Sequence, residues 1–158
     1  MTIKCCFIRE SYFTDHQWYF NLLDTGNLKK QSRRAHLCLC IENNNNRFLI
    51  PLRNNLGDDV RKFGRIGHAI PSLKRDNAGL DFRYALIVND DKYIEWPNEQ
   101  KIPNSQYNKI IKDYDDIKQE FTVYVNGYIK VARKRRVSKE PLYRVSSLQN
   151  FNNELGIK

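Results

Sequence analysis

The sequence lacks the signatures of several large enzyme classes. It contains neither the G-x-x-x-x-G-K-[ST] loop nor the G-x-G-x-x-G loop that bind nucleotide phosphates. The H-E-x-x-H motif of zinc peptidases and the G-x-S-x-G motif of serine hydrolases are also missing. The acidic residues form no obvious two-metal cluster, so the sequence does not predict a metal-dependent nuclease. We expect neither a metal nor a cofactor.

The sequence also lacks the cysteine spacings of zinc sites and disulfides, and it lacks apolar runs long enough to span a membrane. The four cysteines occur as the close pairs Cys5–Cys6 and Cys38–Cys40. Adjacent cysteines seldom form a disulfide because the short loop strains its geometry, and neither spacing matches the C-x-x-C of zinc sites. We therefore expect free thiols that pack as small core side chains. No apolar run approaches about 18 residues and no signal peptide is evident, which predicts a cytoplasmic protein without a membrane partner.

Positive charge is the feature that the sequence has in excess. Lysine and arginine number 27 against 18 acidic residues, which gives a formal net charge of +9 at pH 7. Such an excess is typical of proteins with an anionic partner, most often nucleic acid. The alternative is a protein that uses its charge only for solubility. The 158 residues, of which 41% are hydrophobic, suit a single domain spanning residues 1–158.

Residues 34–55 predict a central β-hairpin. Two apolar runs of strand length flank four asparagines, the residue that best tolerates the left-handed backbone of a turn. Neither run alternates cleanly, so we expect both faces of the hairpin to be covered. Because antiparallel pairing brings the start of one strand beside the end of the next, Arg34 should lie close to Arg53, Asn54 and Asn55. This cluster favours phosphate chemistry, and a solvated hairpin end is the alternative.

The other elements follow from local patterns. No alternating series of strands and helices supports a doubly wound parallel sheet. Trp18 and Phe20 should be partly buried by the first predicted helix, which spans residues 14–24. The sequence predicts a strand over residues 3–8, a helix over 14–24, a strand over 84–88, a short helix near 104–111, a long helix from 115 to about 136, and a short strand followed by a capped helix over 143–156.

Two basic loops, at residues 29–34 and 57–74, and the basic end of the long helix extend the predicted nucleic-acid surface. Residues 57–74 form a long loop rich in glycine and basic residues, a type that is usually functional or mobile. For each basic group, simple solvation is the alternative. The predicted RNA-binding residues are Lys29, Lys30, Arg33, Arg61, Lys62, Arg65, Arg75, Arg133, Lys134, Arg135 and Arg136.

His68 is the candidate general base. It lies in the long loop among arginines, and cationic neighbours favour the neutral imidazole that a base needs. A loop histidine with no catalytic role is the alternative. His36 lies inside a predicted strand and should be a structural residue.

Metal-free chemistry on RNA fits these residue types. RNA carries its own nucleophile, the 2′-hydroxyl, next to each phosphate. Cleavage then needs only a base, an acid and donors to the charged transition state. An RNA-binding module without catalysis is the alternative, because basic grooves with stacking aromatics bind single strands without cleaving them; a basic scaffold for acidic proteins is a third. The candidate catalytic residues are Arg34, Arg53, Asn54, Asn55, His68 and Lys74.

The sequence resembles the toxins of type III toxin–antitoxin systems, the ToxN, CptN and TenpN families. The resemblance rests on the hairpin that leads into Ile50–Pro51–Leu52–Arg53–Asn54–Asn55, on Gly79–Leu80–Asp81–Phe82, on Tyr93–Ile94, and on the closing segment from Leu148 to Gly156. These features occur in the same order and span most of the chain. The TenpN branch is the most similar, chiefly through the tail.

The resemblance implies an α+β fold with a strongly twisted, partly barrel-like antiparallel sheet related to the Kid/MazF toxins, flanked by helices that include a long one in the C-terminal half. It implies a sequence-selective, metal-independent endoribonuclease that leaves a 2′,3′-cyclic phosphate on cellular or phage RNA. It also implies a partner: a small repeat RNA antitoxin of pseudoknot type, which the toxin processes and which then inhibits it in a closed toxin–RNA complex. Release of the toxin would arrest growth during phage infection.

The resemblance also assigns roles. Arg34 matches the basic residue that enters the first hairpin strand, and Arg53 and Asn54 match the site segment after Pro-Leu. Arg34 and Arg53 would hold phosphate, Asn54 and Asn55 would position the substrate, and His68 or Lys74 would transfer protons. Many members carry Ser or Thr where this chain has Arg53–Asn54–Asn55. Because the substrate supplies the nucleophile, an amide can replace a positioning hydroxyl.

Overall fold

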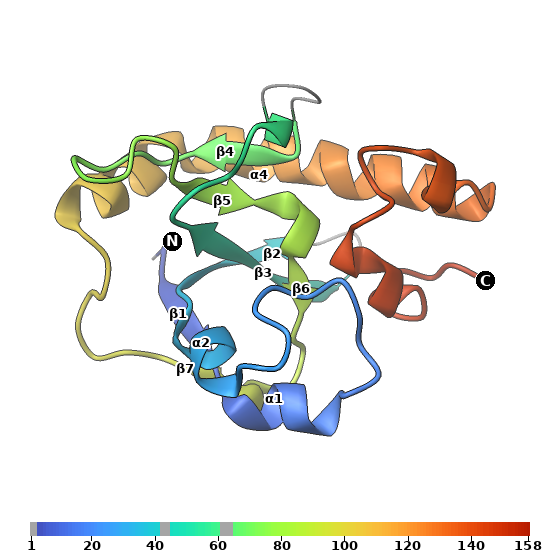
Figure 1. Ribbon diagram of the computed structural model, residues 1–158, viewed down its shortest axis with the longest axis horizontal. Coiled ribbons are helices and arrows are strands. Elements are labelled where there is room, and N and C mark those ends of the chain that lie inside the picture. The colour runs from blue at the N-terminus through green and yellow to red at the C-terminus, as the bar shows by residue number, and fades with distance from the viewer. Residues whose placement is uncertain (1–2, 42–44, 61–64) are drawn as a thin grey trace.

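The computed structural model describes residues 3–41, 45–60 and 65–158. It is an antiparallel sheet crossed by one long helix (Figure 1). The strands are ordered β4-β5-β3-β2-β1-β7, and β6 also pairs with β3. The predicted α+β class with a twisted antiparallel sheet is confirmed, and in the described part of the chain the sheet does not close into a barrel. The strands are β1 (Cys5–Ile8), β2 (His36–Ile41), β3 (Asn46–Arg53), β4 (Gly67–Ala69), β5 (Gly79–Asp81), β6 (Leu86–Ile87) and β7 (Ile94–Glu95).

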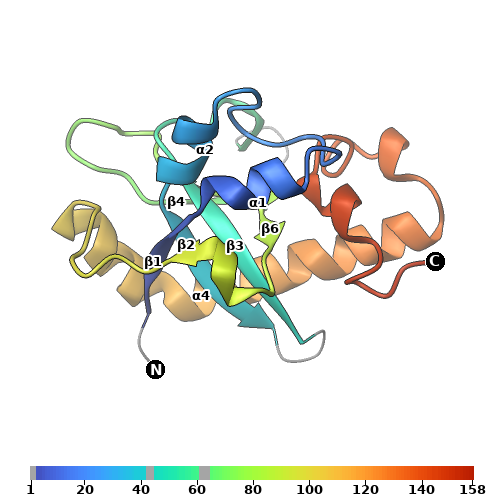
Figure 2. The ribbon, with the colours of Figure 1, turned by 90° about the horizontal axis from the view of Figure 1, so that it is seen from below.

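The predicted hairpin is the pair β2–β3. Its register runs from His36 opposite Pro51 to Ile41 opposite Asn46. Asn45 adopts a φ of 53°, the left-handed backbone expected of the turn, whereas residues 43 and 44 of that turn lie outside the described residues. Consecutive residues 48–50 are fully buried, so both faces of β3 are covered as predicted. Helix α4 lies on one side of the sheet, and α1 and α2 lie on the other (Figures 1 and 2).

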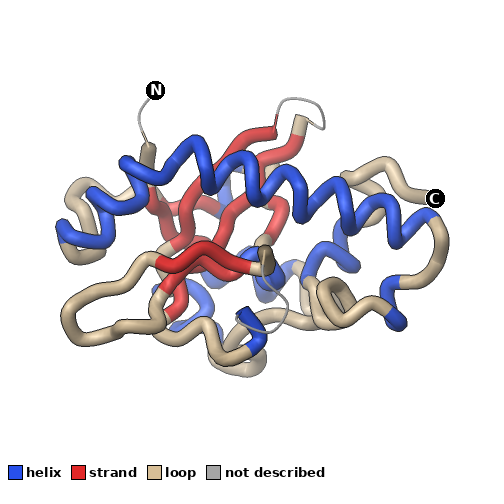
Figure 3. The backbone as a smooth tube through the Cα atoms, turned by 90° about the horizontal axis from the view of Figure 1, so that it is seen from above, coloured by secondary structure: helices blue, strands red, loops and turns tan. Residues whose placement is uncertain are grey.

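Helix α4 (Asn104–Arg133) is one continuous helix where the sequence predicted two (Figure 3). Tyr114 lies on the same apolar stripe as Ile110 and Ile117, so the stripe continues through the expected break. Phe121 packs against Phe48 of β3 at 5.2 Å between ring centroids. A helix of this length spans about 45 Å. Among the described residues, no helix combines the length and the apolar character needed to cross a membrane.

The first two helices differ from prediction. Helix α1 covers only Glu10–Asp15, and the chain leaves helical geometry at His16, whose φ and ψ are −128° and 48°. Further along, Asn21 and Asp24 adopt left-handed φ values of 56° and 55°, so the helix predicted over 14–24 does not form. Trp18 and Phe20 are therefore exposed rather than partly buried. The basic segment expected to be a loop forms α2 (Leu28–Arg33), which begins where the Asn27 side chain accepts a hydrogen bond from the amide of Lys30.

Several shorter predictions also need correction. The loop predicted over residues 57–74 contains strand β4. The strand predicted over 84–88 is shorter and follows a 3-10 turn at Phe82–Tyr84, and the tail contains turns and a 3-10 helix at Ser147–Phe151 in place of a strand and an α-helix. The cysteines are free as predicted, but Cys40 is exposed rather than in the core. The remaining 3-10 turns are Asp91–Tyr93 and Val137–Lys139.

His36 is a buried structural residue of β2, as predicted. Its Nδ1 lies 2.9 Å from the carbonyl oxygen of Arg34. Burial, the main cause, lowers the pKa of this imidazole from 6.5 to about 4, so the ring is held in its neutral form. Between these two pKa values the unfolded chain binds more protons than the folded one.

Stability should consequently fall on acidification through the window set by His36. The contribution of the neutral ring is fully present above pH 6.5 and is lost as the pH falls towards about 4. We expect a loss of about 2 kcal/mol in the free energy of unfolding by about pH 5, measured by urea denaturation. A His36→Gln variant, which keeps a side-chain donor, should show a smaller loss over the same range; an identical loss in both proteins would contradict the assignment.

Candidate nucleic-acid interface

The end of the β2–β3 hairpin forms a wall of an open cleft of about 750 Å³. Four segments that are distant in the sequence line it. They are the end of α2 with Arg34 and Ala35, the residues Leu52 and Asn54 at the end of β3, residues 72–75, and the stretch from Lys101 to Gln106 at the start of α4. The turn at 72–75 is closed by two backbone hydrogen bonds between Ser72 and Arg75, which places the exposed Lys74 at its tip.

The lining of the cleft is strongly cationic. Among its described residues there is neither a carboxylate nor a histidine. Asp24, beside the cleft, accepts a hydrogen bond from Arg34 at 2.6 Å and forms an ion pair with Lys30 at 3.4 Å, and Glu95 pairs with Arg33 at 3.3 Å. The other three cations form no ion pair with a described residue, so their charge faces solvent. The six basic lining residues are Lys30, Arg33, Arg34, Lys74, Arg75 and Lys101.

The N-terminus of α4 opens into the same cleft. Its N-cap is Pro103, whose side chain offers no acceptor, and the first helical hydrogen bond runs from the Tyr107 amide to the Pro103 carbonyl. The amides of residues 104–106 therefore have no partner within the helix, and the helix dipole adds positive potential there. The side-chain amide of Gln106 donates to the carbonyl of Ile70 at 2.8 Å and ties the helix start to the strand β4 segment. Cations and free amides together suit a phosphate group.

The candidate catalytic residues divide into two groups. Arg34, Asn54 and Lys74 line the cleft. Arg53 does not line the cleft. Successive residues of a strand point to opposite faces, so Leu52 and Asn54 face the cleft and Arg53 faces away from it, where its guanidinium donates to Asp81 at 2.8 Å. Asn55 is occupied by hydrogen bonds from Asn77 and from the Gly57 amide. Arg34, Arg53, Asn54 and Asn55 therefore lie at one end of the sheet, as predicted, but they do not form one cluster on one face of it.

The interpretation of His68 as a loop base among arginines is wrong about its surroundings. His68 lies on β4, with Nδ1 2.6 Å from a Glu120 oxygen and Nε2 2.9 Å from an Asp113 oxygen. Each ring nitrogen therefore faces an acidic side chain of α4 and not an arginine. The hydrogen bond from His68, and then that from Lys109, lowers the pKa of the Asp113 carboxyl. His68 thus links β4 to α4, outside the cleft.

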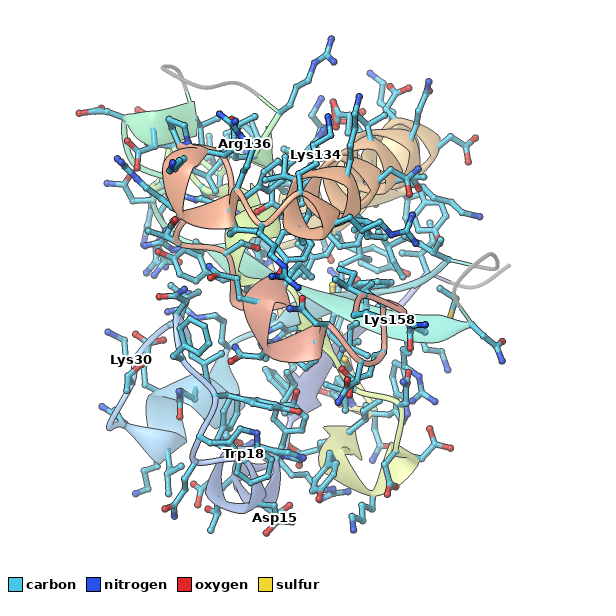
Figure 4. The ribbon with its side chains drawn as sticks, turned by 90° about the vertical axis from the view of Figure 1, so that its right-hand side faces the viewer. Asp15, Trp18, Lys30, Lys134, Arg136 and Lys158 are labelled. Carbon is cyan, nitrogen blue, oxygen red and sulfur yellow. The ribbon has the colours of Figure 1, made fainter. Side chains whose placement is uncertain are left out.

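The predicted RNA-binding residues also separate. Lys30, Arg33 and Arg75 line the cleft, and Lys29 is exposed on α2 beside it, while Arg65 is exposed just before β4. Figure 4 shows Lys134 and Arg136 at the end of α4, apart from Lys30. The exposed residues Arg133, Lys134, Arg135 and Arg136 lie at that far end, about 45 Å of helix from the cleft. Arg61 and Lys62 lie outside the described residues.

Sequence reasoning missed one wall of the cleft. Lys101, Ser105 and Gln106 line it but were not singled out. These residues could have been found from the sequence, because a helix start was predicted at residue 104 and helix N-termini attract anions. No group of three or more His, Cys, Asp or Glu side chains in the described part of the chain is arranged to hold a metal ion.

Comparison with known proteins finds a likeness of fold but not of sequence. No protein-family model matches the chain, and no curated protein matches it. Among solved structures, the fold is similar to that of AbiQ, a lactococcal anti-phage endoribonuclease belonging to the type-III toxin–antitoxin system, with a TM-score of 0.57 and 13% sequence identity. The likeness covers 78% of this chain and 81% of AbiQ. The two chains therefore share a fold.

Proposed function

We propose that this chain is an endoribonuclease toxin of a type III toxin–antitoxin system, most similar to the TenpN branch. The observation that carries the proposal is the cationic cleft, where Lys74, Arg75 and Lys101 meet the uncapped N-terminus of α4. The cleft lies on a fold shared with AbiQ, and the family resemblance of the sequence points to the same activity. Its charge and free amides match the phosphates of RNA.

The proposed reaction needs no metal because the substrate brings its nucleophile. The 2′-oxygen attacks the adjacent phosphorus, the bond from phosphorus to the 5′-oxygen breaks, and a 2′,3′-cyclic phosphate and a 5′-hydroxyl result. One proton leaves the 2′-hydroxyl and one is delivered to the 5′-oxygen. Lys74 carries one of these protons and solvent water the other, Arg34 and Arg75 stabilise the negative charge on the phosphorane, and Asn54 positions the sugar.

The proposed partner is a small repeat RNA of pseudoknot type. The toxin would cleave its precursor within the repeats, remain bound to the product and be inhibited by it in a closed toxin–RNA complex. Cellular or phage RNA is the substrate once the toxin is free, and the proposed location is the cytoplasm. The cleft and the basic end of α4 give such an RNA two cationic regions at opposite ends of the protein.

A non-catalytic RNA-binding module is the second candidate. It is favoured by one observation: the described lining of the cleft contains no histidine and no carboxylate, the commonest general bases. Charge and aromatic residues serve binding as well as cleavage.

Expression in bacteria separates the two candidates. A free nuclease should arrest growth within a few cell divisions of induction, and a Lys74→Ala variant expressed at the same level should be tolerated. A binding module predicts normal growth for both proteins. Growth arrest by both proteins at equal levels would contradict the assignment of Lys74.

A variant of His68 tests independently whether the active site is the cationic cleft, because His68 lies outside it. Replacing His68 with Ala removes two hydrogen bonds between β4 and α4, so we expect the free energy of unfolding to fall by about 1–2 kcal/mol. RNA cleavage per folded molecule should stay within about twofold of wild type, because the ring lies outside the cleft. Loss of cleavage at unchanged stability, measured by urea denaturation, would restore His68 as a catalytic base.

A further inference from the structure

A second hollow adjoins the cationic cleft. It measures about 270 Å³ and shares Ala35, Lys101 and Ile102 with the cleft, so the two are direct neighbours. Its other walls are strand β1 with the residues before it and the segment from Trp96 to Gln100 after β7. The side chains of Lys101 and Ile102 and of Ala35 therefore border both sites.

The hollow presents an aromatic surface that is held in place and partly exposed. Trp96 follows β7, whose pairing with β1 at Phe7 and Glu95 fixes the backbone, yet 43% of the Trp96 surface is exposed. Tyr107 forms a second aromatic wall, and its hydroxyl donates to the carbonyl of Ile3. The Lys4 amine lies over the Trp96 ring, 5.8 Å from its centroid, and adds a cation on one face of the indole. Large exposed indoles on rigid backbone are suited to stacking.

Polar groups border the aromatic surface. Asn98 and Glu99 are exposed, and their side chains make no hydrogen bond or ion pair with a described residue. The Gln100 amide, by contrast, donates to the Ile102 carbonyl at 3.0 Å and to Asn104 at 2.9 Å. An amide and a carboxylate beside an aromatic ring offer both donors and acceptors to the edge of a nucleobase.

We propose that this hollow, lined by Trp96, Tyr107, Asn98 and Glu99, is a base-binding subsite. It takes the nucleobase of a nucleotide in single-stranded RNA whose neighbouring phosphate lies in the cleft. Proteins that bind single strands combine a cationic groove for the backbone with aromatic side chains for the bases, which is the arrangement of these two adjoining sites. The inference rests on the proposed function, because it takes RNA as the ligand of the cleft.

The first test uses Trp96 as its own reporter. The chain contains two tryptophans, and Trp18 is 70% exposed on the segment after α1, so a Trp18→Phe variant leaves Trp96 as the only indole. The ligand is a 2′-O-methyl oligoribonucleotide, which lacks the nucleophile and stays intact. Stacking should quench the Trp96 fluorescence, whereas an oligomer of abasic nucleotides with the same number of phosphates should bind without quenching. Equal quenching by both, or by neither while both bind, would overturn the subsite.

Variants of Trp96 give the energetic test. Trp96→Ala should weaken binding of the 2′-O-methyl oligomer by about tenfold, and Trp96→Phe, which still stacks, by much less. Neither variant should change the affinity for the abasic oligomer, and melting temperatures check that both proteins are folded. If Trp96→Ala binds both ligands like wild type while wild type cleaves RNA, the subsite is wrong and the proposed function stands. If wild type neither binds nor cleaves RNA, both are overturned.

Discussion

Replacing Lys74 with Ala should lower the rate of RNA cleavage by at least about 100-fold, because a positioned proton donor or acceptor contributes that much or more. Lys74 lies at the tip of the turn closed between Ser72 and Arg75 and faces the cleft without an ion-pair partner among the described residues. The backbone of that turn does not depend on the lysine side chain, so the fold should be unchanged. Single-turnover cleavage at saturating protein isolates the chemical step from binding.

Two further variants separate proton transfer from charge. Lys139→Ala removes one exposed positive charge beyond the far end of α4 and should cleave RNA like wild type. Lys74→Arg keeps the charge but holds its proton too strongly to exchange it, so it should bind RNA normally and cleave slowly. Cleavage by Lys74→Ala within about twofold of wild type would remove Lys74 from the mechanism. Full cleavage by Lys74→Arg would assign it to phosphate binding.

Replacing Asp81 with Ala should lower the free energy of unfolding by about 3–5 kcal/mol, a large part of the stability of a small protein. Asp81 is fully buried on β5 and accepts hydrogen bonds from Arg53 at 2.8 Å and from Arg83 at 2.9 and 3.0 Å. Without the carboxylate, the buried Arg83 loses its main counter-ion. The end of β3, which leads directly to Asn54 in the cleft, loses its anchor through Arg53.

Asp59→Ala is the matched control for this variant. Asp59 pairs with the same Arg83 at 2.9 Å but its side chain is 55% exposed. Water replaces an exposed carboxylate readily, so this change should cost at most about 1 kcal/mol. Urea denaturation of the two variants measures the difference. Equal and small losses would show that Arg83 and Arg53 do not depend on the buried carboxylate.

The sequence predicted the hairpin well because its information is local. Residues 46–50 and the asparagine turn fix the pairing of β2 with β3, and antiparallel geometry then brings Arg34 to the same end as Asn54. The face of the sheet towards which the Arg53 side chain points could not be predicted in the same way. Both runs are apolar throughout, so no alternation marked which side chains point into the cleft and which towards Asp81.

Features set by tertiary contacts were beyond the local patterns. The partners of His68 are Asp113 and Glu120, which lie far along the chain on α4 and replace the arginines that the sequence places beside it. Helix α1 ends at Asp15, and within the segment predicted to be helical Asn21 and Asp24 take left-handed backbone, which either residue type allows but does not require. The cleft itself is a meeting of four separate segments.

End-group analysis tests the proposed function most directly. Purified protein is incubated in EDTA with structured and with A-rich RNA, and the termini of the products are determined. Cleavage that leaves 2′,3′-cyclic phosphate and 5′-hydroxyl ends, and that is lost in Lys74→Ala, is the result expected of a metal-independent toxin acting in the cationic cleft. Tight binding of RNA without cleavage would contradict it and assign the cleft to an RNA-binding module.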